Sequence, residues 1–132
     1  MKRTELKRGT KGLSRGKGLK SGKGLKARSD RKIASDDLKP PVREAVFRRD
    51  GARCRLRGLP GGGQCFGGLT PHHRRRDSQG GAYSLFNLVT ACAHHNSLLE
   101  SDADFAAAAE AVGLVVRRGH PDWDRCGIDD PL

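Results

Sequence analysis

The 132-residue chain is poor in the residues that build a large hydrophobic core. Aromatic residues make up 5% of it, and it has one Met and one Trp. No apolar segment is long enough for a signal peptide or a membrane span, and Met1 leads directly into charged residues. We therefore expect one small domain in a reducing cytoplasm, in which a bound metal or a disulfide supplies part of the stability.

Lysine is missing from most of the chain. All nine lysines lie in residues 1–39, which hold 14 Lys and Arg against 4 acidic residues, a net charge of +10. Residues 40–132 hold 12 Arg against 11 acidic residues, a net charge of +1. A Lys-Gly-Leu repeat with a period of six covers residues 11–28, and one Leu per repeat cannot offset the entropy cost of ordering so much Gly. Residues 1–39 are thus predicted to be a disordered basic tail, which either contacts nucleic-acid phosphates or only keeps the protein soluble.

Cysteine is also scarce, and each Cys is far from the next in sequence. In a reducing compartment, scattered Cys beside His indicates a metal site, with a disulfide as the alternative. The Cys92-x-x-His95 spacing is typical of half a zinc site, and two further thiols would complete it. The predicted structural zinc ligands are Cys54, Cys65, Cys92 and His95. His94 is the competing fourth ligand, and Cys126 is predicted not to bind the metal.

Apolar spacing and capping residues predict short elements of both kinds. We expect helices over 41–49, 92–100 and 103–112, a strand at 69–73, a strand or turn at 87–90, and a terminal strand at 114–116.

Basic residues gather beside two histidines. Arg74, Arg75 and Arg76 follow His72 and His73 directly, where core packing does not easily explain them. Guanidinium groups bind phosphodiester oxygens bidentately, so this cluster is predicted to hold a nucleic-acid backbone. Two more candidates for phosphate contact lie on the helix predicted over 41–49: Arg48 and Arg49.

The order of these motifs resembles the HNH endonuclease family in its prokaryotic and phage versions. The resemblance covers about residues 42–118 and rests on Arg-Arg-Asp-Gly before a Cys, on His-His before a Gly-Gly loop, on Asn-Leu-Val-Thr, and on the stretch from Cys92 onward. It implies an α+β fold, namely a small ββα-metal domain over residues 40–118 with flanking helices and a C-terminal extension over 119–132.

The resemblance also implies a role for individual residues. His72 matches the family's metal ligand, and His73 matches the general base that takes a proton from the attacking water. Asn87 matches the central asparagine, which holds the metal loop and helps to orient the base. His95 stands where the family has its second Cys, and Asn96 stands where it has its final His.

This last departure implies an HNN variant, in which a carboxamide oxygen of Asn96 binds the catalytic metal. Oxygen ligands favour hard ions, so Mg²⁺ or Mn²⁺ is predicted there rather than Zn²⁺. Glu100 is one helical turn beyond Asn96, where it either adds a carboxylate ligand or is an ordinary exposed residue.

Three function classes compete on these residues. The first is a metal-dependent DNA endonuclease, acting as a monomer or a dimer with mostly backbone contacts and weak sequence preference. The second is a non-catalytic, zinc-stapled nucleic-acid-binding module. The third, an RNA-associated basic protein, rests on the tail alone. His73 separates the first two, because a binding module has no use for a free imidazole beside a metal.

Overall fold

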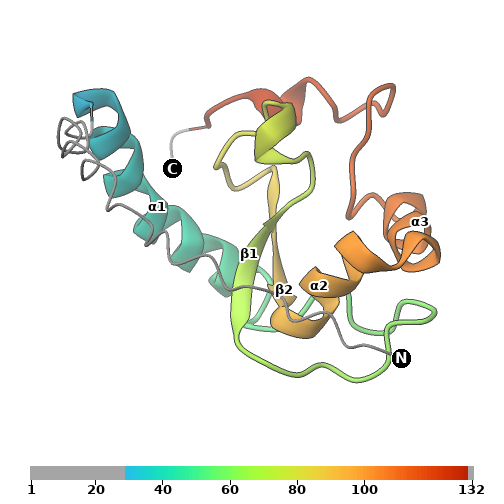
Figure 1. Ribbon diagram of the computed structural model, residues 1–132. Helices are drawn as coiled ribbons and strands as arrows, with labels where there is room; N and C mark the ends of the chain where they lie inside the picture. The colour runs from blue at the N-terminus through green and yellow to red at the C-terminus, as the bar shows by residue number, and fades with distance from the viewer. Residues whose placement is uncertain (1–28, 131–132) are drawn as a thin grey trace, which may run out of the picture.

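The computed structural model describes residues 29–130, so the predicted basic tail lies largely outside the described residues. The chain folds into a small α+β unit with a two-stranded sheet (Figure 1). Its elements are, in order, α1 (Asp30–Arg49), β1 (Leu69–His73), the 3-10 helix η1 (Asp77–Gln79), β2 (Leu88–Cys92), α2 (Ala93–Ser101), α3 (Ala103–Ala111) and the 3-10 helix η2 (Arg125–Gly127). No helix among residues 29–130 combines the length and apolar character that a bilayer span requires.

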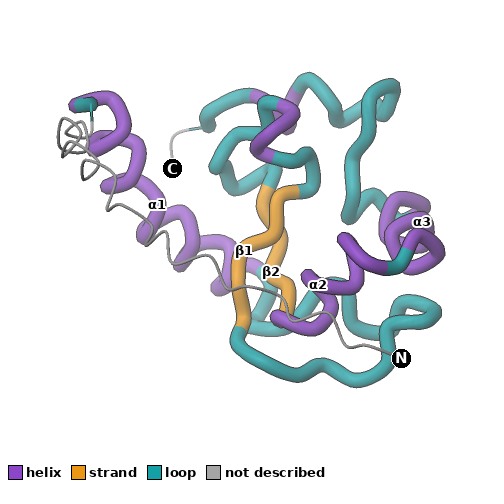
Figure 2. The backbone as a smooth tube through the Cα atoms, viewed as in Figure 1, coloured by secondary structure: helices purple, strands orange, loops and turns teal. Residues whose placement is uncertain are grey.

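The two strands, β1 and β2, pair antiparallel. Leu69 pairs with Cys92 at one end, and His73 pairs with Leu88 at the other. All five residues of β2 are buried, whereas β1 is half-buried throughout. The chain enters α2 directly from β2, so the order strand, strand, helix is continuous in space (Figure 2). The strand expected at 69–73 is confirmed, and the second strand extends to Cys92.

The first helix is longer than the sequence predicts. We expected a helix over 41–49, but α1 begins at Asp30, with the Ser29 side chain accepting a hydrogen bond from a backbone N–H of the first turn. Pro40 and Pro41 lie inside it and lack the N–H that an interior helical residue donates. Val46 is fully buried one turn after Val42, so packing secures the C-terminal half. The part from Asp30 to Lys39 belonged to the predicted disordered tail and is helical instead.

Two small hydrophobic clusters form the core. One joins the loop after α1 to β2, α2 and α3, and it includes Leu56, Leu99 and Phe105. The other joins α1 to the start of β2 through Val42, Val46 and Leu88. The helices expected over 92–100 and 103–112 are confirmed as α2 and α3, the latter capped by an Asp102 side chain that accepts from two backbone N–H groups.

The strand expected at 114–116 is absent from the described sheet. Val116 donates one hydrogen bond to the carbonyl of Arg74, just beyond the end of β1, at 2.8 Å. Leu114 and Val115 pack against the core cluster around Phe105. A single backbone hydrogen bond holds the segment beside β1 but does not make a strand ladder. The apolar residues therefore predicted packing against the core correctly, whereas the predicted strand was wrong.

The C-terminal segment packs onto the domain. Cys126 is fully buried, and its carbonyl accepts a hydrogen bond from Ala82 at 2.8 Å. The guanidinium group of Arg75 lies over the Trp123 ring, with its Cζ 4.1 Å from the ring centroid. The packed unit therefore continues beyond residue 118, where the sequence placed the end of the domain.

Candidate metal centre and adjoining pocket

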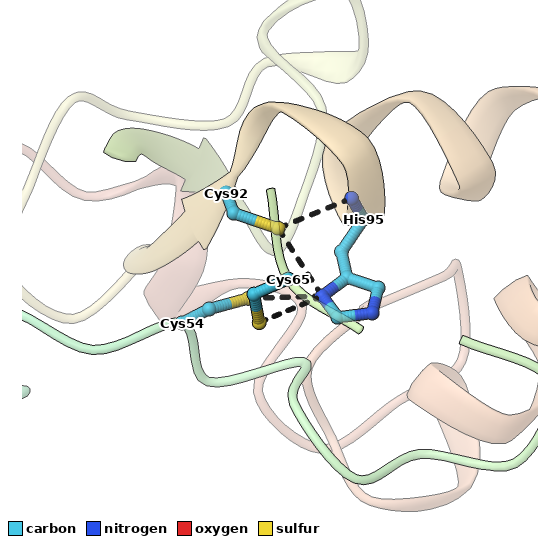
Figure 3. A group of neighbouring side chains, drawn as sticks. All are labelled: Cys54, Cys65, Cys92 and His95. Atoms are coloured by element: carbon cyan, nitrogen blue, oxygen red, sulfur yellow. Dashed lines mark hydrogen bonds between the residues drawn. The ribbon is translucent and has the colours of Figure 1, made fainter. Parts of the chain in front are cut away.

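Four metal-binding side chains converge at the start of α2. The donor atoms of Cys54, Cys65, Cys92 and His95 all lie within 4.8 Å of one another (Figure 3). Cys92 is the last residue of β2 and the N-cap of α2, and His95 lies in the first turn of that helix. Cys54 and Cys65 come from the two ends of the Gly-rich loop, so the cluster joins the two halves of the domain.

The spacing within this cluster fits a tetrahedral ion. The Nδ1 atom of His95 lies 3.3 Å from the sulfurs of Cys54 and Cys92, and 3.5 Å from that of Cys65. Zinc bonds of about 2.3 Å to sulfur and about 2.0 Å to nitrogen would separate the two ligands by roughly 3.5 Å. The four residues therefore make a group that could hold a metal such as zinc, as the sequence predicted.

A backbone carbonyl orients the histidine of this cluster. His95 is fully buried, and its Nε2 lies 3.0 Å from the carbonyl oxygen of Gly62. A proton on Nε2 donates to that carbonyl and leaves the Nδ1 lone pair directed at the sulfurs, the usual outer-shell arrangement of a ligating His. A Cβ on Gly62 would lie 2.7 Å from the Phe105 ring and 2.8 Å from His95, so only glycine permits this approach.

The competing ligands lie elsewhere. The Nε2 of His94 also approaches the carbonyl of Gly62, at 3.0 Å, and its ring stacks on Phe66. The fully buried Cys126 is outside the cluster, and all four cysteines are free thiols, so the disulfide alternative is not realised.

Burial and the neighbouring thiols shift the pKa values of the clustered cysteines. Desolvation of the sulfur and the neighbouring thiols of Cys54 and Cys92 raise the pKa of Cys65 to about 11. Burial opposes ionisation of Cys92 as well, but hydrogen bonds from the backbone of His95 and Phe66 lower its pKa overall. Several thiolates held this close need a cation between them, because each disfavours the charge of the next.

A second pair of donors lies one residue further along α2. The Nδ1 of His72, on β1, lies 3.0 Å from Oδ1 of Asn96. The Nε2 of His72 is buried and has no hydrogen-bond partner among the described residues. Burial lowers the pKa of His72 to about 4, so its imidazole is neutral at physiological pH and available as a ligand.

His72 and His73 line one pocket of about 420 Å³. The His73 side chain makes no hydrogen bond within residues 29–130, and its ring meets the edge of Tyr83 at 5.7 Å. Burial lowers its pKa most, the nearby Asp77 carboxylate raises it, and the Lys39 ammonium lowers it, with a net lowering. The lowered pKa favours the neutral imidazole of His73, which has one ring nitrogen able to accept a proton.

Asn87 supports the loop that carries the histidines. Its side chain is fully buried, and its Oδ1 accepts the backbone N–H of Arg75 at 2.8 Å. Its Nδ2 donates to the carbonyls of Arg75 and Ala82, at 3.0 and 2.9 Å. Among the described residues no hydrogen bond joins Asn87 to His73, so any effect on the predicted base passes through the backbone two residues away.

Three of the five arginines predicted to bind phosphate are engaged inside the protein. Arg74 donates to the carbonyls of Gly113 and Phe86 and pairs with Asp122. Arg75 donates to the carbonyls of Gln79 and Trp123. Arg49 likewise donates to backbone carbonyls, those of Leu85 and Leu88. These hydrogen bonds occupy much of the donor capacity of the three guanidinium groups and tie distant segments together, and their contact with a phosphate backbone stays a prediction.

The remaining two arginines are exposed. The Arg48 side chain is 77% exposed, and within residues 29–130 it pairs only with Glu44. Arg76 lines the same pocket as His72 and pairs with Glu100 at 3.0 Å. The Glu100 carboxylate, predicted as a tentative metal ligand, therefore lies beside the pocket but is bound to a guanidinium in this structure.

Sequence reasoning missed two residues of the pocket, Arg117 and Arg118, which follow α3 and contribute to its lining. The sequence signal that could have identified them is an Arg-Arg pair directly after three apolar residues. The chain matches no protein-family model, no curated protein and no solved structure.

Proposed function

We propose that the protein is a metal-dependent endonuclease of the HNH type that hydrolyses phosphodiester bonds in DNA. The observation that carries this proposal is that His72, whose Nδ1 lies 3.0 Å from Oδ1 of Asn96, lines the same pocket as His73. A group that could hold zinc, with two further possible metal ligands beside it, is hard to explain if the protein only binds nucleic acid. The continuous order of β1, β2 and α2 supports a ββα-metal arrangement.

The pair fits a hard divalent ion. Two adjacent ligands of an octahedral ion with bonds of about 2.1 Å are roughly 3.0 Å apart, which is the separation of Nδ1 of His72 and Oδ1 of Asn96. Waters and substrate oxygens would complete such a shell, as is usual for Mg²⁺. The bound ion would polarise the phosphate and stabilise the charge that develops on the leaving 3′ oxygen.

His73 supplies the base in this proposal. Its lowered pKa keeps the ring neutral near pH 7, so a ring nitrogen accepts a proton from water while the oxygen attacks phosphorus. The bond from phosphorus to the 3′ oxygen then breaks. Asn87 keeps the loop after β1 in place through its three hydrogen bonds, and this holds His73 at the end of the strand.

A plasmid-nicking assay tests the proposal. Purified full-length protein is incubated with supercoiled DNA and Mg²⁺, Mn²⁺ or Zn²⁺, with and without chelator, beside His73→Ala. We expect metal-dependent nicking that falls by about 10²–10⁴-fold in the variant, the usual contribution of a general base, while DNA binding and Tm stay unchanged. Equal loss of binding and cleavage would count against His73 as the base.

The second candidate is a zinc-stapled nucleic-acid-binding module without catalysis. It is favoured by the Cys54, Cys65, Cys92 and His95 cluster, which can stabilise the fold without any contribution from the pocket. Tight, salt-sensitive DNA binding with no cleavage under any metal would select this function instead.

A further inference from the structure

The pocket beside the two histidines has a second part of its lining that the proposed reaction leaves unused. This part comes from the segment after α3 and includes Arg117 and Arg118. We propose that Arg117 and Arg118 form a phosphate-binding site for the nucleic-acid strand that enters the pocket. The inference rests on the proposed function, and it moves the phosphate contacts away from the arginines that follow His73 in sequence.

The backbone under these two residues is fixed against the histidine strand. Val116 is 1% exposed, and its N–H donates to the carbonyl of Arg74, the residue directly after His73. Leu114 and Val115 both donate to the carbonyl of Ala109 at the end of α3, at 2.9 and 3.3 Å. The segment therefore leaves α3, meets the end of β1 and presents the next two side chains beside the pocket.

A tight turn fixes the backbone at Arg118. The N–H of His120 donates to the carbonyl of Arg117 at 3.0 Å, which closes a four-residue turn. Gly119 is the third residue of this turn and has φ of 97°, a backbone conformation that glycine adopts without strain. Arg118 is therefore the second residue of a constrained turn rather than part of a loose loop.

The guanidinium groups of this pair are available to a ligand. Arg118 is exposed and has no hydrogen-bond or ion-pair partner within the described part of the chain. The Nε of Arg117 pairs with Glu110 at 2.8 Å, with side chains 62% and 39% exposed. Such an exposed ion pair contributes at most about 1 kcal/mol, so a phosphate can replace it.

The charges around the pocket favour an anion next to these residues. Glu100 is the one acidic residue in its lining, and it pairs with Arg76. Arg74 is already bound to internal carbonyls and to Asp122. Arg118 thus has no acidic partner among the described residues, and Arg117 has only its exposed pair with Glu110. Both carry their charge in the planar form that binds phosphate oxygens two at a time.

The test compares DNA binding of two variants made in the His73→Ala protein, so that no cleavage interferes. One is Arg117→Gln with Arg118→Gln. The matched control is Arg57→Gln, an exposed arginine that borders the Cys cluster and not the pocket. Affinity for a fluorescent DNA duplex is measured between about 50 and 200 mM salt in Mg²⁺. This slope of log affinity against log salt is negative, and each lost phosphate contact reduces its magnitude by about 0.9.

We expect the magnitude of the slope to fall by about 1.8 in the double variant and to stay unchanged in Arg57→Gln. Arg118→Lys, which keeps the charge, is expected to preserve the slope, and Tm confirms that each variant is folded. An unchanged slope in the double variant, or an equal fall in the control, overturns the phosphate site.

The same proteins with His73 restored separate this inference from the proposed function. The expected result is a rise in KM for DNA cleavage that exceeds the fall in kcat. If wild-type protein cleaves DNA while the double variant keeps its slope and rate, the nuclease stands and the phosphate site is rejected. If no protein cleaves DNA but the slope falls as expected, the phosphate site stands and the nuclease proposal fails.

Discussion

Two consecutive residues of α2 have different surroundings. His95 is fully buried and faces three sulfurs, whereas the half-buried Asn96 contacts the imidazole of His72. The sulfur cluster has four donors and an oriented histidine, so a bound ion would have no open position. In the proposed catalytic site, the pair of His72 and Asn96 would leave most of a coordination shell to water or substrate. Closed sets of ligands are typical of structural metals, and open sets are typical of catalytic ones.

The same difference appears in the arginines. Those whose guanidinium groups bind carbonyls, such as Arg74 and Arg75, stabilise the fold around the pocket. Those without such partners, such as Arg118, are free to bind a ligand. Charge alone does not separate the two groups, because partner geometry decides which role a guanidinium has.

The largest expected effect breaks the closed site. Zinc bound by a complete structural set contributes about 10 kcal/mol or more to folding. We therefore expect Cys54→Ser to release zinc and to lower Tm more than any other change proposed for this protein. Metal analysis and calorimetry measure both effects. Cys126→Ser is the matched control, since Cys126 is buried outside the cluster and its loss should leave the zinc content unchanged. An unchanged Tm in Cys54→Ser would refute the zinc site.

The next largest effect disrupts the loop that supports the open site. A Cβ on Gly81 would lie 1.8 Å from the carbonyl oxygen of Arg75 and 2.8 Å from Nδ2 of Asn87. Backbone cannot yield to such a clash, so Gly81→Ala is expected to cost about 3 kcal/mol and to impair cleavage while zinc remains bound. Gly68→Ala is the control, because its Cβ would meet nothing within 4 Å. Urea unfolding compares the two, and equal stability would show that the Asn87 loop tolerates rearrangement.

Acid provides an intermediate effect that depends on His72. Its pKa is about 4 in the folded protein, below about 6.5 in the unfolded chain, so the unfolded state binds the proton more readily. Stability is therefore complete above about pH 6.5 and falls as the pH drops toward 4, with about 2 kcal/mol lost by pH 5. Urea unfolding of wild type and His72→Gln at several pH values isolates this part. If both proteins lose stability equally on acidification, His72 is not the group responsible.

The smallest expected effect concerns Glu100. Its ion pair with Arg76 has side chains 62% and 55% exposed, so Glu100→Gln should change the free energy of unfolding by less than about 1 kcal/mol. If Glu100 also contributes to the open site, the variant needs more Mg²⁺ for half-maximal cleavage at an unchanged Tm. A Mg²⁺ titration of nicking measures this. An unaltered requirement would leave Glu100 only as the partner of Arg76.

Local patterns predicted the elements that carry the metal donors. The Cys92-x-x-His95 spacing predicted a helix start with two ligands, and the structure has Cys92 as the N-cap of α2. The choice between His94 and His95 was open, because neighbouring residues on one helix differ only in direction. Both histidines contact the carbonyl of Gly62, but only the Nδ1 of His95 faces the sulfurs, which makes His95 the member of the cluster.

The sequence by itself determined the residue types and spacings of the chemistry: scattered thiols, a His-His pair, and arginine in place of lysine beyond residue 39. These features can be read directly from neighbouring residues in the sequence. Tertiary structure alone decided which arginines are free, because the acceptors of Arg74 and Arg75 include Gly113, Asp122 and Trp123, about 40 to 50 residues away. It also decided that Arg117 and Arg118 reach the pocket, since one hydrogen bond from Val116 to the end of β1 brings them there. Contacts between distant segments depend on how the whole core packs, and no local pattern records that.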